Sequence, residues 1–402
     1  MLFLPSLQST TSRNGMGRAG CPTQQMTGSE KMTIFKIIIL ALAGAMIGHY
    51  MGKHAMDSLI DANIKATKRY ALACVAILGF IIIMVVLDAQ IRIGWVLSAL
   101  LCALGFAFGF LFYILHNSAV GLKVKWNDQV GEVIPGLDYD TTRPETGYDL
   151  YLPKKKTEDK TYALVMYVHG GGFTGGSKKD GALWCKYMTA KGYVCASMDY
   201  TLQGKEQKSD LHLMSRQVLQ CVEAVHKECI MRGYPVTEMA VTGGSAGGTI
   251  ALLFAYGLSK QSPVPLKFVF QQVGPVCFDP IWWGATNNDY KMQAMFISNF
   301  SGEDVTEEMV KKNAHLPIVA AMSPASLVRE DTVPTLSAYG PRDKMVPAQL
   351  KYHLFEALEK NHVPYDYVEY PNSNHALYDD PKAQREFLKK LDEYCVRYFE
   401  HH

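Results

Sequence analysis

Three long apolar stretches dominate the first third of the chain, at about residues 33–50, 70–87 and 93–115. The second and third are each long enough to cross the hydrocarbon core of a bilayer as a helix. Neither "CVAILGFIIIMVVL" nor "GWVLSALLCALGFAFGFLFYIL" contains a charged residue. The pattern therefore predicts about three transmembrane helices within residues 33–116. A buried helical hairpin is the alternative, and the shorter first stretch also fits the apolar part of a signal peptide, although no A-x-A-like cleavage site follows it.

Basic residues favour one side of this predicted membrane segment. Those of the first loop and of the segment after the third stretch are Lys53, Lys65, Lys68, Arg69, Lys123 and Lys125. Three spans put both segments on one side, so the positive-inside rule places the rest of the chain in the cytoplasm. The polar residues 1–32 are predicted to be a disordered lead, in which Met26 and Met32 are alternative starts.

From about residue 160 the pattern changes to short β-rich stretches that alternate with amphipathic helices. The expected strands are "YALVMYV", "YVCASMDY", "MAVTG", "KFVFQQVG", "TLSAYG" and "YDYVEYP". Several are continuously apolar, as expected for strands covered on both faces. One helix follows Leu211 and ends at Gly233, the last begins at "DDP", and residues 122–152 predict an antiparallel lead-in. Residues 117–402 are thus expected to form an α/β fold with a mostly parallel sheet flanked by helices.

One interval, residues 276–325, interrupts this alternation and is rich in aromatic side chains. A connection of this length inside a regular α/β fold is usually functional, so we expect a lid here. An extra pair of packing helices without a gating role explains the interval equally well. The aromatic residues suit an apolar acyl pocket, and they suit core packing just as well.

Composition excludes several classes of function. Apolar residues make up 48% of the chain, charged residues 19%, and the net charge is only +2, so bulk charge gives no case for nucleic-acid binding. The nine cysteines form no C-x-x-C pair and no cluster with histidine at metal-ligand spacing. We therefore expect buried thiols in a reducing compartment, and neither a metal site nor a cofactor.

The sharpest chemical signal is "VTGGSAGGTIALLFA", in which Ser245 is the centre of a G-x-S-x-G pattern. An expected strand precedes the serine and an expected helix follows it, which is the context that a nucleophilic serine on a tight turn requires. Small residues on both sides of the serine allow this turn. A glycine-rich structural turn is the alternative, and it is less consistent with the strand–helix junction.

A nucleophilic serine needs a base, and the base needs an acid that orients it. Asp343 follows the expected strand "TLSAYG", and His375 follows the last expected strand, so both lie at carboxyl ends of strands. Asp379 and Asp380 compete for the role of the acid, but they are placed as helix N-caps. Two other histidines, His353 and His362, fall on or beside a helix.

The motif "HGGGFTGGS", residues 169–177, directly follows the strand "YALVMYV". A glycine-rich backbone can approach a reacting group closely and offer it bare N–H groups, as an oxyanion requires. A phosphate-binding loop is the rival interpretation. The order of serine and lysine in "GGSK" does not fit that motif, and no helix is expected to begin at Ser177.

Together these motifs resemble the hormone-sensitive-lipase-like branch of the α/β-hydrolase superfamily, which includes carboxylesterases and feruloyl-esterase-like members. The resemblance covers roughly residues 120–400 and rests on "HGGGFTGGS", "MDYTL", "GGSAGG" and the later Asp343 and His375. It implies that Ser245 is the nucleophile, His375 the general base and Asp343 its orienting acid. It also implies that the amides of Gly171, Gly172 and Ala246 form the oxyanion hole. Gly170 permits the turn of this loop. Gly244, Thr201 and Pro341 depart from the family pattern, and Pro341 puts the position of the acid loop in doubt.

The expected function is a membrane-anchored serine hydrolase that cleaves small carboxylic esters through an acyl-enzyme. An amidase, a peptidase or an acyltransferase with the same triad is the alternative among enzymes. A catalytically silent binding module held at the membrane is the alternative from another class. A transporter is less consistent with the sequence, because the apolar stretches contain no paired charges.

Overall fold

The computed structural model describes most of the chain beyond the apolar stretches. The described residues are 122, 124–143, 145–154, 161–204, 209–377 and 380–400. The predicted lead and the predicted transmembrane segment lie outside them. Within the described part, no helix combines the length and the apolar character needed to cross a bilayer.

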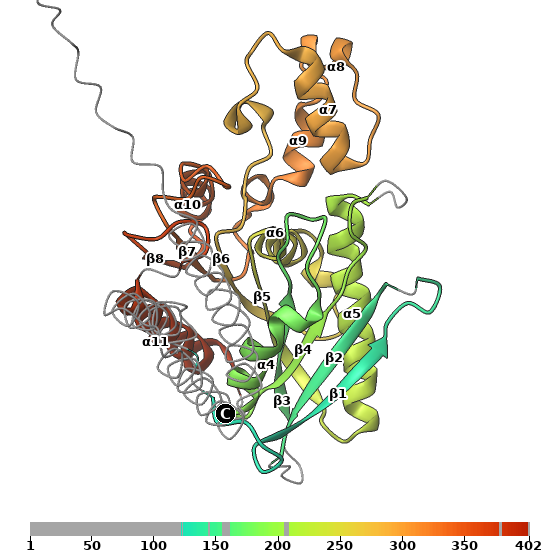
Figure 1. The fold of residues 1–402 in the computed structure, drawn as a ribbon, viewed down its shortest axis with the longest axis vertical. Coiled ribbons are helices and arrows are strands. Elements are labelled where there is room, and N and C mark those ends of the chain that lie inside the picture. Colours follow the sequence, from blue (N-terminus) through green and yellow to red (C-terminus); the bar gives the residue numbers. More distant parts are fainter. Residues whose placement is uncertain are drawn as a thin grey trace, which may run out of the picture.

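An eight-stranded sheet in the order β1-β2-β4-β3-β5-β6-β7-β8 forms the centre of the fold (Figure 1). The strands are β1 Gly131–Asp138, β2 Gly147–Pro153, β3 Tyr162–Val168, β4 Val194–Met198, β5 Val236–Gly244, β6 Leu266–Gln272, β7 Thr335–Tyr339 and β8 Tyr365–Glu369. β1, β2 and β4 pair antiparallel, whereas β4, β3 and all later strands pair parallel. The six expected strands and the antiparallel lead-in are confirmed.

Helices cover both faces of this sheet, which explains why the central strands are apolar throughout. The long helices are α4 Ala182–Thr189, α5 Leu211–Met231, α6 Ala246–Leu253, α10 Leu350–Lys360 and α11 Pro381–Tyr398. α4 and α11 share one face, where the rings of Trp184 and Phe387 meet. α5 and α6 pack together on the other face, and short turns η2 Phe254–Leu258 and η3 Ser259–Gln261 extend α6.

α5 shows how the local sequence fixes an element. The side chain of Asp210 accepts a hydrogen bond from the amide of Leu213 and so caps the first turn. The predicted apolar stripe is fully buried, and its members are Leu211, Val218, Cys221, Val222, Val225 and Cys229. After the helix ends, Gly233 takes a φ of +74°, so the predicted glycine stop is confirmed.

Residues 276–325 form a helical cap rather than an irregular loop. Its elements are η4 Pro280–Trp283, α7 Tyr290–Ser301, α8 Glu307–Lys311, α9 Leu316–Met322 and η5 Pro324–Leu327. Figure 1 shows α7, α8 and α9 grouped beyond the end of the sheet, at the top of the view. The rings of Phe278, Phe296 and Phe300 pack against one another inside the cap. That this cap moves as a lid stays a prediction.

Cysteines in the described residues are free thiols. All but the half-buried Cys277 are buried. Burial raises the pKa of Cys195 and Cys229 to about 12. These thiols are therefore protonated at neutral pH and pack as small apolar side chains.

Candidate active site

Ser245 occupies the turn between β5 and α6. Its φ of +55° and ψ of −126° are rare for a residue with a side chain, and such strain persists only where the surroundings impose it. The amide of Ser245 donates to the carbonyl of Gln272 on β6 at 2.8 Å, and the Ser245 carbonyl accepts from the amide of Thr249 at 3.2 Å. The strand and the helix therefore hold the serine at the carboxyl end of the sheet.

Gly244 and Gly247, on either side of the serine, differ in the space available for a side chain. A Cβ atom at Gly247 would lie 2.1 Å from the carbonyl oxygen of Val168 on β3, so the packing leaves no room for a side chain. At Gly244, a Cβ atom would meet only the carbonyl oxygen of Gln272, at 3.8 Å. The departure from the family pattern at Gly244 therefore falls where the backbone has space for a side chain.

Gly247→Ala is accordingly expected to destabilise the protein by about 3 kcal/mol or more, at the upper end of the cost of overpacking. The methyl group would push α6 away from β3 and displace Ser245. Gly244→Ala is the matched control and is expected to cost less than about 1 kcal/mol. Urea unfolding of the two variants measures the difference, and equal losses would show that the close approach of α6 to β3 is not required.

The structure brings Ser245, His375 and Asp343 together. His375 Nε2 lies 2.8 Å from Ser245 Oγ, and His375 Nδ1 lies 2.7 Å from Asp343 Oδ2. With the imidazole proton on Nδ1, the ring donates to the carboxylate of Asp343 and Nε2 accepts from the serine hydroxyl. The side chains of His375 and Asp343 are 17% and 2% exposed, so the imidazole reaches solvent while the carboxylate is buried.

The buried carboxylate of Asp343 is fully hydrogen-bonded. Its Oδ1 accepts from the amides of Met345 and Val346, both at 2.9 Å, which leaves Oδ2 for His375. The amide of Arg342 donates to the carbonyl of Ser373 and so joins the acid loop to the histidine loop. Pro341 therefore does not move the acid out of reach of His375.

Asp380 is hydrogen-bonded to residues 372 and 373, in the loop that carries His375. It stands at the N-cap position of α11, as predicted, but its side chain makes no hydrogen bond to the helix. Its carboxylate instead accepts from the amide and side chain of Asn372 and from Ser373 Oγ, at 2.9, 2.8 and 2.6 Å. Burial raises the pKa of Asp380, but these hydrogen bonds outweigh burial and leave the pKa below its ordinary value. Of the two competing acids, Asp379 lies outside the described residues.

The lowered pKa of Asp380 predicts an acid-sensitive contribution to stability. A carboxylate whose pKa is depressed on folding stabilises the fold above its unfolded pKa, and this is lost as the pH falls through the folded pKa. Asp380→Asn should therefore unfold more easily than the wild type at neutral pH, with the difference shrinking below about pH 4. Urea unfolding of both proteins from pH 7 to pH 3 measures this, and a difference independent of pH would contradict it.

The glycine-rich loop passes directly over the serine. A Cβ atom at Gly170 would lie 3.4 Å from the Cβ of Ser245 and 2.9 Å from the carbonyl of Gly244. Gly171 and Gly172 both have positive φ, at 117° and 61°, which turns the loop back on itself. Within the described residues, the amides of Gly171, Gly172 and Ala246 have no hydrogen-bond acceptor.

One expectation about this loop is wrong. A short helical turn, η1 Lys178–Gly181, does begin after Ser177, which is its N-cap residue. Ser177 and Asp180 form a capping box, which is the signal in the sequence for this turn. The amide of Ser177 donates to Asp180 Oδ2 and that of Lys178 to Asp199 Oδ1, at 3.0 and 2.7 Å. Because carboxylates already bind these amides, the turn offers no place for a phosphate.

His169, the first residue of the motif, has a structural role. Its ring stacks on Tyr200 with centroids 4.2 Å apart, and its Nδ1 lies 2.7 Å from the Gly170 carbonyl. Burial lowers the pKa of His169, so the ring is neutral at pH 7. The contacts that the side chains of Tyr200, Thr201, Gln217 and Asp380 make around this loop and the His375 loop were not predicted, because they depend on the tertiary fold.

The sheet order and the strand–serine–helix turn define the α/β-hydrolase fold. The model of the BD-FAE family matches residues 148–358, which is more than half of the chain, and the chain belongs to this family. It is also 25% identical over 229 residues to human arylacetamide deacetylase-like 2. That match covers 56% of this chain and 49% of the human protein, so the chain spans about half the length of this curated relative.

Solved structures of esterases share the fold. A truncated carbohydrate esterase from gut microbiota superposes with a TM-score of 0.56 at 15% identity, over 68% of this chain and 99% of that one. Esterase B from Lactobacillus rhamnosis gives 0.54 at 19% identity, over 72% and 94%. Esterase 2 from Thermogutta terrifontis gives 0.52 at 17% identity, over 67% and 93%. At these identities the likeness shows a shared fold.

Proposed function

We propose that the protein is a serine hydrolase that cleaves small carboxylic esters through an acyl-enzyme. The observation that carries the proposal is the 2.8 Å contact between His375 Nε2 and Ser245 Oγ, with Asp343 hydrogen-bonded to the other ring nitrogen. A serine becomes a nucleophile when such a base takes its proton. The esterases and the deacetylase-like protein that the chain resembles support ester bonds as its target.

The geometry accommodates a two-stage reaction. Ser245 Oγ attacks the ester carbonyl carbon while its proton passes to His375 Nε2, and the carboxylate of Asp343 stabilises the resulting imidazolium. The carbonyl oxygen becomes an oxyanion, for which the donors are the amides of Gly171, Gly172 and Ala246. His375 then protonates the leaving alcohol, and the acyl group remains on Ser245. Water, deprotonated by His375, releases the acid in the second stage.

Amide hydrolysis, peptide hydrolysis and acyl transfer would use the same residues. They differ from ester hydrolysis in the leaving group or in the acceptor of the acyl group. A silent binding module would not need the strained φ of Ser245 or the fully bonded carboxylate of Asp343. Both features favour an enzyme.

The test uses the full chain and two assays. A fluorophosphonate probe is expected to label the wild-type protein, with the modified peptide containing Ser245. p-Nitrophenyl esters of graded acyl length, the matching anilides and an acceptor alcohol separate the esterase from the amidase and the acyltransferase. Faster turnover of the anilides than of the esters would replace the ester assignment, and absence of both labelling and turnover would overturn the proposal.

The apolar sequence of residues 33–116 supports a second part of the proposal, a membrane anchor with the catalytic domain on the cytoplasmic side. The argument is the length of the uncharged stretches and the bias of basic residues. The full chain should stay in the membrane pellet after carbonate washing. Protease added to intact cells should leave residues 117–402 uncut. Release by carbonate, or digestion from outside, would contradict the anchor or its orientation respectively.

A further inference from the structure

The backbone segment 199–203 contacts the oxyanion loop, residues 169–177, at two places and the turn η1 that follows the loop at a third. At the start of the loop, Tyr200 stacks on His169 and its hydroxyl donates to the His169 carbonyl at 3.1 Å. Near the middle, the amide of Gln203 donates to the Phe173 carbonyl at 2.8 Å. At the end, Asp199 accepts from the amide of Lys178. The position of this segment therefore determines the position of the loop.

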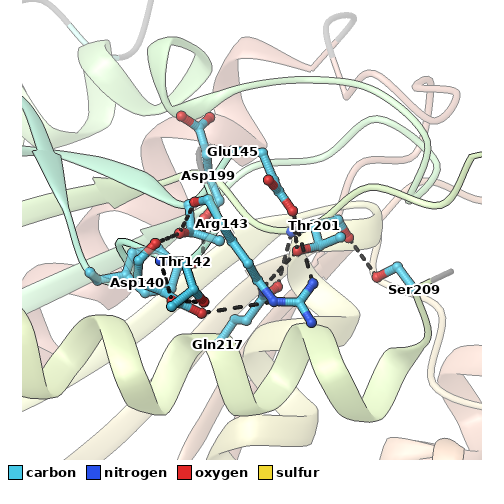
Figure 2. A network of polar contacts seen from close by, with 10 residues as sticks. Asp140, Thr142, Arg143, Glu145, Asp199, Thr201, Ser209 and Gln217 are labelled. Carbon is cyan, nitrogen blue, oxygen red and sulfur yellow. Dashed lines mark hydrogen bonds and ion pairs between the residues drawn. The ribbon is translucent and has the colours of Figure 1, made fainter. Parts of the chain in front are cut away.

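Thr201, in the middle of the segment, belongs to a network of polar contacts with Gln217, Ser209 and Glu145 (Figure 2). Its amide donates to Gln217 Oε1 at 2.9 Å, and Gln217 Nε2 donates back to Thr201 Oγ1 at 2.7 Å. Ser209 Oγ donates to the Thr201 carbonyl at 2.6 Å, and Thr201 Oγ1 donates to Glu145 Oε1 at 3.2 Å. Both polar groups of the Thr201 backbone and its hydroxyl thus have partners.

The pair formed by Thr201 and Gln217 is buried and joined by two hydrogen bonds. Both residues have no exposed surface, and Gln217 lies in the second turn of α5, whose apolar stripe packs on the sheet. Two hydrogen bonds in opposite directions fix the orientation of the Gln217 amide, and a buried polar group that loses its partner costs about 1–3 kcal/mol. Segment 199–203 therefore has one favoured position relative to α5.

We propose that Gln217 and Thr201 are positioning residues for the oxyanion hole. They anchor segment 199–203 to α5, and this segment in turn sets the distance between the Gly171 and Gly172 amides and the substrate carbonyl oxygen that becomes negative when Ser245 attacks. Neither residue touches the reacting atoms. The inference rests on the proposed function, because it concerns the same reaction.

The test replaces Gln217 with methionine, which keeps the length of the side chain and removes both hydrogen bonds. Gln217→Met is expected to lower kcat for a p-nitrophenyl ester about tenfold, less than the loss of a complete oxyanion donor. KM should change by less than about twofold, because the ground-state ester does not need the hole. Inhibition by a trifluoromethyl ketone, whose adduct with Ser245 carries an oxyanion, should weaken by the same factor as kcat.

Four further variants separate positioning from general stability. Gln220→Met makes the same change on the exposed side of α5 and should leave kcat unchanged. Val225→Ala removes buried apolar volume from the same helix. It should lower the urea midpoint without weakening inhibition by the trifluoromethyl ketone. Thr201→Val, which replaces the hydroxyl with a methyl group, should behave as a milder Gln217→Met. Thr201→Ser, which keeps the hydroxyl, should keep the kcat of the wild type.

Two results would overturn the inference. One is full kcat and full ketone inhibition in Gln217→Met. The other is a kcat that falls in Val225→Ala as much as in Gln217→Met at equal stability. Ser245→Ala distinguishes these results from a failure of the proposed function: if that variant keeps its activity, the reaction does not use this site at all.

Discussion

Ser245→Ala is expected to abolish ester hydrolysis, with kcat falling by about 10⁴-fold or more, as in other hydrolases that lose their nucleophile. The Ser245 hydroxyl is hydrogen-bonded to His375 Nε2, and alanine has no hydroxyl with which to form the acyl-enzyme. The fold should survive, because the methyl group of alanine occupies the space of the existing Cβ. Steady-state hydrolysis of a p-nitrophenyl ester measures the loss.

A matched control and a second readout complete this test. Ser326 is an exposed serine on η5, and Ser326→Ala should keep full turnover and full labelling by a fluorophosphonate. Ser245→Ala should keep its urea midpoint and lose all labelling. Unchanged turnover in Ser245→Ala would show that hydrolysis takes place elsewhere in the chain.

Local sequence patterns were sufficient to predict the sheet and to select the residues that meet in the site. Continuous apolar runs identified the buried strands, because a strand covered on both faces has no polar side. The carboxyl ends of parallel strands share one edge of the sheet, so motifs following "MAVTG", "TLSAYG" and "YDYVEYP" had to meet there. Their catalytic roles remain predictions until the variants are measured.

Such patterns could not predict the hydrogen-bond partners of Asp380 and Gln217. Asp380 was correctly placed at the start of a helix, but the preference of aspartate for that position could not show that its carboxylate binds Asn372 and Ser373 instead. Gln217 looked like one polar residue on an amphipathic helix. Its partner Thr201 is 16 residues away in the chain, and only the tertiary fold brings their side chains together.

Asp343→Asn should lower kcat by about 10⁴-fold, the loss typical of a triad that keeps its shape but has the wrong imidazole tautomer. The amides of Met345 and Val346 both donate to Oδ1, so the asparagine must place its carbonyl oxygen there. Its NH₂ group then faces His375 Nδ1, which has to accept a hydrogen bond. The ring proton moves to Nε2, and Nε2 can no longer take the proton of Ser245.

Asp380→Asn provides the comparison that decides which aspartate is the acid. Asparagine at this position loses some of the hydrogen bonds to Asn372 and Ser373, but the contact between Asp343 and His375 stays in place. We therefore expect kcat to fall about tenfold at most. NMR of the imidazole nitrogens adds a readout that stability does not affect: the Nδ1 proton signal of His375 should persist in Asp380→Asn and disappear in Asp343→Asn. If Asp380→Asn instead loses as much activity as Asp343→Asn together with the Nδ1 proton, Asp343 is not the residue that orients the base.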